Sequence, residues 1–128
     1  MAKRSRKTVA NNKKAFHDYT IEERYEAGIV LTGTEIKSVR QGKVSIKEAY
    51  VRIKNGEAIV QGMNISPYEQ GNRFNPDSKR VRRLLMHKRE IMRLLGKVKQ
   101  DGYSLIPLSV YLKGSRVKVK VGLCKGKK

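Results

Sequence analysis

The amino-acid sequence predicts a mostly β fold with flanking helices: an OB-like closed antiparallel β-barrel of about six strands with two or three short helices. Several short segments alternate apolar and polar residues, which is the pattern of strands that bury one face. An Asn55-Gly56 pair between two such segments is a strong hairpin signal, and two other segments have helical spacing. Closing such strands into a barrel hides their edges, and OB-like barrels commonly bind nucleic acid.

The chain begins with a segment that we expect to be a flexible basic arm. Residues 1–14 contain six Lys or Arg and no acid, and after Met1 their apolar content is only Val9 and alanines. Such a segment buries too little apolar surface to offset the entropy lost on ordering. The OB-like domain is expected to follow over residues 15–124.

A long strand and a short helix are expected next. Residues 19–31 place six apolar side chains on one face, namely Tyr19, Ile21, Tyr25, Ala27, Ile29 and Leu31. Gly28 is a candidate bend or bulge within this strand. Thr32 and Glu35 have the spacing of a capping box and Gly42 supplies a C-terminal stop, so a short helix lies between them.

The rest of the domain is predicted as a hairpin, a loop, a helix and two strands. In order, these occupy residues 49–54 and 58–63 (hairpin), 64–78 (loop), 87–100 (helix), and 106–112 and 117–123 (strands). The helix is indicated by a stripe of apolar residues at i, i+3, i+4 and i+7, formed by Ile91, Leu94, Leu95 and Val98. No repeat and no second domain is indicated.

The charge of the chain points to a polyanionic partner. Thirty Lys and Arg stand against 11 Asp and Glu, a formal charge of +19, and this much self-repulsion usually reflects binding to a polyanion. A membrane surface is disfavoured because the chain has no Trp and no lipidation motif. The longest purely apolar stretch, residues 27–31, is too short to span a bilayer, and no signal peptide is indicated. We therefore expect a cytoplasmic protein.

Histidine and cysteine chemistry is not indicated. His17 and His87 lie seventy residues apart, outside any cluster with the spacing of metal ligands. Cys124 is the one cysteine, so no intramolecular disulfide can form. We expect it on the basic side of the last strand, without a histidine to activate it.

Acid chemistry is the remaining catalytic possibility. Glu22, Glu23 and Glu26 could hold magnesium in a nuclease, but a strand points Glu23 away from the other two. We therefore predict that the chain is not an enzyme and uses no metal, no cofactor and no small-molecule substrate.

Two further basic segments follow the N-terminal one. Residues 79–93 carry seven Lys or Arg against one Glu, and residues 116–128 carry six with no acid. Three regions of one sign on one domain are difficult to explain as ordinary solvated surface. Since no helix-turn-helix, zinc finger or basic zipper is present, RNA is favoured over duplex DNA. Few aromatic residues look free to stack on bases, so we predict recognition of phosphates and shape.

Motifs in one order and spacing run from about residue 8 to the end of the chain. They include His17-Asp18-Tyr19, Tyr25-Glu26-Ala27-Gly28-Ile29-Val30-Leu31, Gly33-Thr34-Glu35-Ile36-Lys37-Ser38, Pro67-Tyr68-Glu69-Gln70-Gly71-Asn72, Arg83-Leu84-Leu85 and Val121-Gly122-Leu123. In these motifs the chain closely resembles the small protein B family, the SsrA-binding proteins.

The resemblance implies an OB-like barrel that binds the tRNA-like domain of transfer-messenger RNA. It also implies delivery of that RNA, with elongation factor Tu, to stalled ribosomes for trans-translation, and we expect the protein to be a monomer. Carried over position by position, the implied RNA contacts are Asn12, Lys13, Lys14, His17, Glu26, Lys43, Arg80, Arg82, Arg83, Lys125, Gly126, Lys127 and Lys128. Glu26 would be an acid in a basic field that accepts hydrogen bonds.

Two features depart from the family's pattern. Phe16 stands where the family usually has a basic residue. The family's chains also continue past the Gly-Lys-Lys at 126–128 with a long basic tail, so we expect residues 125–128 to be the start of a tail that is absent here. A generic ribosomal or translation-factor OB protein, a metal-dependent nuclease and a duplex-DNA architectural protein are the alternatives that stay open.

Overall fold

The computed structural model describes residues 6–69, 75–100 and 102–126. In these residues nine strands and three helices follow one another along the chain. They are β1 (Arg6–Asn11), α1 (Lys13–Asp18), β2 (Tyr19–Ile29), α2 (Gly33–Arg40), β3 (Val44–Ser45), β4 (Tyr50–Lys54), β5 (Glu57–Gln61), β6 (Asn64–Ile65), β7 (Arg82–Leu85), α3 (Lys88–Val98), β8 (Tyr103–Lys113) and β9 (Arg116–Gly126).

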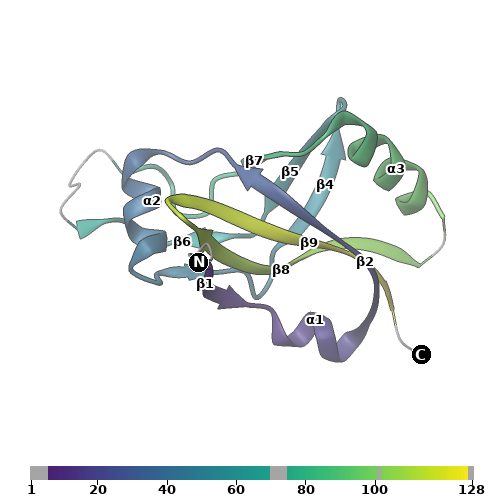
Figure 1. The fold of residues 1–128 in the computed structure, drawn as a ribbon, viewed down its shortest axis with the longest axis horizontal. Helices are drawn as coiled ribbons and strands as arrows, with labels where there is room; N and C mark the ends of the chain where they lie inside the picture. Colours follow the sequence, from purple (N-terminus) through teal and green to yellow (C-terminus); the bar gives the residue numbers. More distant parts are fainter. Residues whose placement is uncertain (1–5, 70–74, 101, 127–128) are drawn as a thin grey trace, which may run out of the picture.

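Six of the strands form a closed ring, and every pairing in it is antiparallel. The order is β8-β4-β5-β7-β2-β9, and β9 returns to β8, while β1 adds to the free part of the β8 edge (Figure 1). The ring closes through short contacts at two places. β2 and β7 share two residue pairs, and β4 meets β8 at the pair Val51–Leu105. The predicted mostly β, OB-like fold is confirmed.

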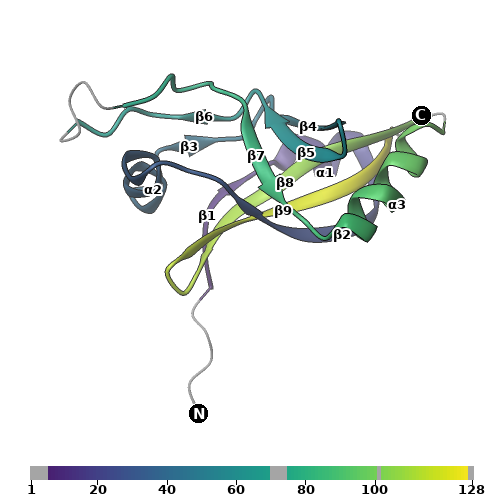
Figure 2. The same cartoon turned by 90° about the horizontal axis from the view of Figure 1, so that it is seen from above.

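The core lies inside this ring. Its fully buried side chains come from all parts of the chain and include Val39, Val60, Met63, Leu84, Leu94, Val110, Val119 and Leu123. α2 and the small β3–β6 sheet lie at one end of the molecule, and α3 lies at the other (Figures 1 and 2). The ends of the ring are therefore covered by different elements.

The predicted boundaries of α2 and of the β4–β5 turn are confirmed. The Thr32 side chain accepts a hydrogen bond from the Glu35 backbone N–H, and the Glu35 carboxylate accepts one from the Thr32 N–H. Asn55 and Gly56 both have positive φ, at 53° and 78°, as a type I′ hairpin turn requires.

α3 is also confirmed as a helix that packs its apolar stripe against the ring. It begins after His87, and Ile91 and Leu94 are buried in the core. A second contact lies at its exposed side, where the Arg93 guanidinium donates to the Glu23 carboxylate of β2. α3 is therefore fastened to β2 by packing and by an ion pair.

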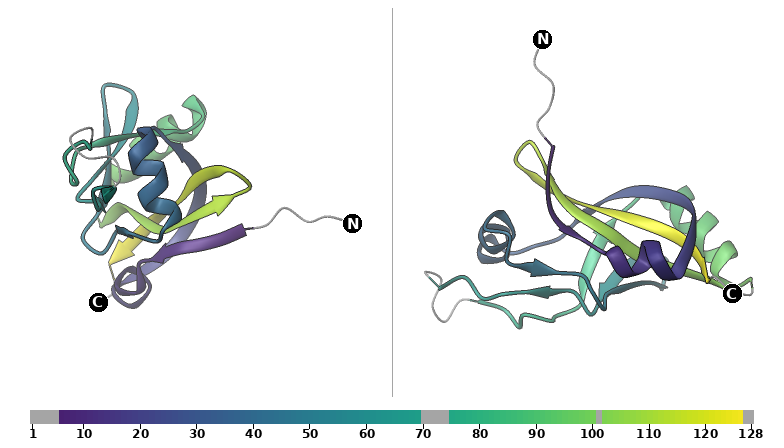
Figure 3. Two further views of the ribbon diagram at one scale, coloured as in Figure 1. Left: turned by 90° about the vertical axis from the view of Figure 1, so that its left-hand side faces the viewer. Right: turned by 90° about the horizontal axis from the view of Figure 1, so that it is seen from below.

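The prediction of a flexible arm over residues 1–14 is wrong for the residues that the structure describes. Residues 6–11 pair with β8, and residues 13–18 form α1; residues 1–5 lie outside the described residues. The cause is a second apolar face on the sheet. Figure 3 shows α1 lying against one side of the sheet. Its Ala15 packs against Ile106, Leu108 and Cys124, so that burial of apolar surface offsets the entropy lost on ordering the segment.

The predicted position of Cys124 on the basic side of the last strand is wrong, because α1 covers this residue. The Cys124 side chain is fully buried and does not lie on a basic face. Burial raises the pKa of the thiol to about 11, which leaves it protonated and unreactive at neutral pH.

Besides β1, three further strands were not predicted. β3 and β6 pair with each other in the stretch on either side of the β4–β5 hairpin, and β7 closes the ring between β5 and β2. β7 escaped the alternation pattern because its inward side chains are Arg82 and Leu84, and an inward arginine has no apolar signal. The predicted loop over 64–78 therefore begins with a strand, and residues 70–74 of it lie outside the described part of the chain.

Candidate nucleic-acid interface

Arg82 and Arg80, both predicted to contact RNA, are held by a buried glutamate. The Arg82 Nε donates to Glu35 Oε2 at 2.8 Å, and an Arg80 NH donates to Glu35 Oε1 at 2.6 Å. Arg82 is fully buried and also donates to the carbonyls of Met63, Ser78 and Arg80. Its guanidinium is thus engaged within the fold, and the RNA contact predicted for Arg82 stays a prediction.

The ion pairs keep Glu35 charged in the interior. Burial raises the pKa of Glu35, but hydrogen bonds from Arg80, from the Thr32 backbone and from Arg82 outweigh burial and hold the pKa below its ordinary value. The cluster joins α2 to β7 and to the segment before β7. It fixes the end of the molecule from which Lys43 projects, exposed, between α2 and β3.

Asn12 is a second predicted contact that the structure places in the interior. Its Oδ1 accepts from the Ala15 N–H as the N-cap of α1, and its Nδ2 donates to the Pro107 carbonyl at 3.2 Å and the Ile46 carbonyl at 3.4 Å. Only 4% of the residue is exposed. The side chain therefore anchors α1 to the sheet, and the RNA contact predicted for Asn12 stays a prediction.

The predicted basic residues of α1 are exposed. Lys13 and Lys14 lie in its first turn, and His17, whose side chain is 90% exposed, contacts Asp18 at 2.9 Å. Lys125 and Gly126 lie at the same end of the sheet, because Gly126 pairs with Tyr19, the residue directly after α1. These five predicted residues form one exposed group, and Lys127 and Lys128 lie outside the described residues.

Glu26 lies about seven residues further along β2, roughly 23 Å from that group at the usual rise of a strand. Its carboxylate accepts a hydrogen bond from the Tyr111 hydroxyl at 2.5 Å and lies 3.4 Å from the Lys113 Nζ. The hydrogen bond from Tyr111, followed by that from Lys113, lowers the pKa of Glu26 against the opposing effect of burial. A negative charge is therefore maintained at this position at neutral pH.

Two adjoining hollows surround Glu26 and share Arg116 and Lys118 as lining residues. The larger, of about 670 Å³, is also lined by Arg83 and by Leu85. We refer to the surface of Glu26, Arg83, Leu85, Arg116 and Lys118 as the Glu26 face. The other acids that line the larger hollow are engaged within the protein, since Glu57 pairs with Arg83 at 3.3 Å and Glu90 caps α3.

Three residues of this face were not among the predicted RNA contacts: Arg116, Lys118 and, as its one apolar member, Leu85. The Leu85 side chain projects from β7 against Gly28, and 51% of it is exposed. Because single exposed leucines are common on protein surfaces, the case for this face rests on the setting of Leu85 beside three cations and a fixed carboxylate. The signal was hidden because β7 itself was not predicted.

Other kinds of site find no support in the described residues. Across residues 6–69, 75–100 and 102–126, no group of three or more His, Cys, Asp or Glu could hold a metal ion. Within that same part of the chain, no helix has the length and apolar content needed to cross a bilayer.

Comparison with known proteins gives the same family as the sequence motifs described above. The model of the SmpB protein family matches residues 9–128. The SsrA-binding protein of Bacillus cytotoxicus is 58% identical over 128 residues, covering 100% of this chain and 83% of the relative. That of Carboxydothermus hydrogenoformans is 58% identical over 122 residues, covering 95% of this chain and 82% of the relative.

A solved structure gives the same result in three dimensions. A chain in the structure described as "tmRNA-SmpB: a journey to the center of the bacterial ribosome" superposes with a TM-score of 0.77 at 49% identity, covering 92% of this chain and 83% of that chain. From its sequence and its fold alike, this chain belongs to the SmpB protein family.

Proposed function

We propose that this protein binds the tRNA-like domain of transfer-messenger RNA and delivers that RNA to stalled ribosomes for trans-translation. The observation that carries the proposal is the Glu26 face, where a carboxylate held in its charged form lies beside an exposed leucine and three cations. It occurs in a chain that is 58% identical over its whole length to SsrA-binding proteins.

Each residue type on this face has a separate task in holding folded RNA. Arg83, Arg116 and Lys118 contact phosphates, which supply most of the affinity. Glu26 accepts hydrogen bonds from a ribose 2′-hydroxyl or from a base amino group, since a carboxylate repels phosphate and selects donors. Leu85 packs on the flat face of a ribose or base. Together they favour a shaped RNA surface over a plain polyanion.

The remaining parts of the proposal concern partners. The second exposed group, around Lys13, Lys14, His17, Lys125 and Gly126, gives the molecule another positive surface for ribosomal RNA. We place elongation factor Tu in the delivery complex, the protein as a monomer in the cytoplasm, and no catalytic step on this chain. Arg80 and Lys43 lie outside both exposed groups and are retained as weaker candidate contacts.

A competition experiment tests the function. Labelled tRNA-like RNA is bound to the protein and challenged with unlabelled tRNA-like RNA, unstructured RNA and duplex DNA, in magnesium. We expect only the folded RNA to compete efficiently and the bound RNA to remain intact. Degradation of the RNA would point to a nuclease, and equal competition by the three would leave a generic basic binder.

Leu85→Ala provides a test of the Glu26 face itself. Loss of an apolar contact with RNA should weaken binding about tenfold, the effect of un-burying a large apolar side chain. Met92→Ala is the matched control, because Met92 is 56% exposed on α3 and lies outside the face. Equal effects of the two substitutions would contradict the assignment of this face.

A further inference from the structure

A groove of about 790 Å³ lies between α1, β4 and β8, remote from the Glu26 face. It exists because β4 and β8 pair at a single position, Val51–Leu105, and separate on either side of it. Its floor is apolar and buried, and is made by Ala15, Ala49, Val51, Leu105 and Ile106.

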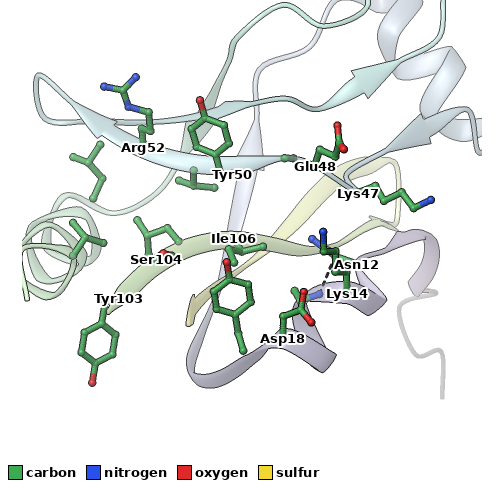
Figure 4. Close-up of a pocket in the computed structure, with 17 residues that line it drawn as sticks. Asn12, Lys14, Asp18, Lys47, Glu48, Tyr50, Arg52, Tyr103, Ser104 and Ile106 are labelled. Carbon is green, nitrogen blue, oxygen red and sulfur yellow. Dashed lines mark hydrogen bonds between the residues drawn. The ribbon is translucent and has the colours of Figure 1, made fainter. Parts of the chain in front are cut away.

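The rim of the groove is aromatic and mostly cationic. Tyr50 of β4, which is 47% exposed, and Tyr103 of β8 both line the groove, and their rings point outward from it on opposite sides, Tyr50 at the β4 edge and Tyr103 at the β8 edge (Figure 4). Lys14, Lys47 and Arg52 supply three positive charges, against Asp18 and Glu48, and Asp18 is already in contact with His17. The groove therefore offers flat apolar contacts inside and an excess of positive charge at its edge.

A second hollow continues from the first along α1 and β1. The two share Asn12, Lys14 and Lys47, and the second adds Lys13. Its lining residues, all within the described part of the chain, include three lysines and no acid. The lysines of the two hollows therefore form a continuous positive path, along which a negatively charged polymer that enters the groove can lead out of it.

We propose that this groove receives an unpaired RNA base, with the sugar-phosphate chain following Lys14 and Lys47 toward Lys13. This inference rests on the proposed function in taking RNA as the partner, and it adds a second contact with different chemistry. A base has an apolar face for the floor of the groove, and the exposed Tyr50 ring at the β4 edge is available for a neighbouring base to stack on, a contact that tolerates any sequence. An uncharged extended peptide would have no charge to match the acid-free lysine path that leads out of the groove.

The chain contains no tryptophan, so Tyr50→Trp gives a reporter without background. The probes are hexa-adenylate and a hexamer of the same charge that lacks the bases. We expect hexa-adenylate to quench the reporter saturably and the abasic hexamer to bind about tenfold more weakly without quenching. Tyr68→Trp is the matched control, because Tyr68 lies against Lys37 outside the groove and should show no quenching.

Two unlabelled variants separate the ring from its hydroxyl. Tyr50→Leu should weaken hexa-adenylate binding about tenfold, and Tyr50→Phe should leave it unchanged. Equal binding of the base-containing and abasic hexamers, or an unaffected Tyr50→Leu variant, would overturn the proposal. Quenching by an uncharged extended peptide in place of hexa-adenylate would also overturn it and assign the groove to a peptide.

The proposed function and the proposed base-binding groove can be refuted independently of each other. Leu85→Ala should weaken binding of tRNA-like RNA without changing hexa-adenylate binding, because it lies outside the groove. If hexa-adenylate binding fails while preference for tRNA-like RNA persists, only the groove assignment is lost. If hexa-adenylate still binds in the groove but the preference for tRNA-like RNA is absent, the groove assignment is kept and the proposed function is refuted.

Discussion

Glu22 and Glu26 lie on one strand and each accepts a hydrogen bond from a tyrosine hydroxyl, Glu22 from Tyr103 and Glu26 from Tyr111. They differ in their surroundings. Glu26 lies among the cations of the Glu26 face, whereas Glu22 is exposed at the start of β2. This pair allows the contribution of one carboxylate to RNA binding to be measured against a close internal control.

Glu26→Gln should weaken binding of tRNA-like RNA by about 1.5–3 kcal/mol, the range for a hydrogen bond to a charged group. Removing a negative charge that served only as solvated surface would instead strengthen binding to a polyanion. Isothermal titration measures the affinity, and the thermal midpoint, which should fall somewhat because the Glu26 carboxylate also accepts from Tyr111 and Lys113, shows that the variant stays folded. Glu22→Gln should be neutral or slightly favourable, and tighter binding by Glu26→Gln would refute the acceptor role.

Glu35 leads to a prediction about stability. Breaking a buried ion pair leaves its partners uncompensated, so Glu35→Gln should lower the free energy of unfolding by about 3–5 kcal/mol. The folded-state pKa of Glu35 lies below the ordinary value of 4.5. Its contribution is therefore present above the unfolded-state pKa and is lost as the pH falls through the folded-state pKa.

Urea unfolding at a series of pH values checks this dependence. The wild-type free energy of unfolding should decline below about pH 4.5, and the Glu35→Gln variant should decline less steeply because one linked carboxylate is gone. Glu57→Gln is the control, since Glu57 forms an exposed pair with Arg83. Parallel pH curves for wild type and Glu35→Gln would show that Glu35 is not linked to folding.

At the scale of elements, the opening of α1 can be measured separately, because α1 covers a cysteine that reacts only when exposed. It covers Cys124, the one cysteine of the chain, and Asn12 holds it through a cap and two buried hydrogen bonds. Asn12→Ala should cost about 0.5–2 kcal/mol for the cap, with a further cost for the buried carbonyls left unpaired. Local opening of α1 should then expose the thiol.

The rate at which Cys124 reacts with a thiol reagent under native conditions measures this opening. Asn12→Ala should accelerate the reaction more than Thr32→Ala, which removes the cap of α2 and leaves α1 intact. Equal acceleration at equal loss of stability would mean that the thiol is reached only by global unfolding. That result would contradict an independently opening α1.

At the scale of the whole molecule, the charge of +19 should govern the salt dependence of RNA binding. If about six phosphates are neutralised, the logarithm of the association constant should fall with the logarithm of salt with a slope between about −4 and −5.5. Filter binding from low to physiological salt provides the measurement. A flat response would refute the electrostatic account.

The salt series also separates affinity from specificity. Because phosphate contacts carry no sequence or shape information by themselves, the preference for tRNA-like RNA over unstructured RNA should persist as salt rises. Its disappearance at physiological salt would indicate that the Glu26 face contributes no selective contact.

The sequence by itself determined the features that arise from local chemistry. The Thr32–Glu35 capping box, the Asn55-Gly56 turn and the apolar stripe of α3 each depend on neighbours within a few residues, and all three were predicted correctly. The net charge is independent of folding, and the family motifs are read directly from the chain. Fold class and polyanion binding therefore followed from the sequence.

Only the tertiary structure decided which polar residues belong to the interior. Arg82 reads as part of a basic cluster, and it is buried because Glu35, 47 residues away, meets it inside the ring. Asn12 reads as part of an arm, and it is buried because the carbonyl of Pro107 accepts from it across 95 residues. β7 and α1 were missed for this reason, since long-range partners stabilise them. The separation of the Glu26 face from the groove at Tyr50 likewise exists only once the ring has closed.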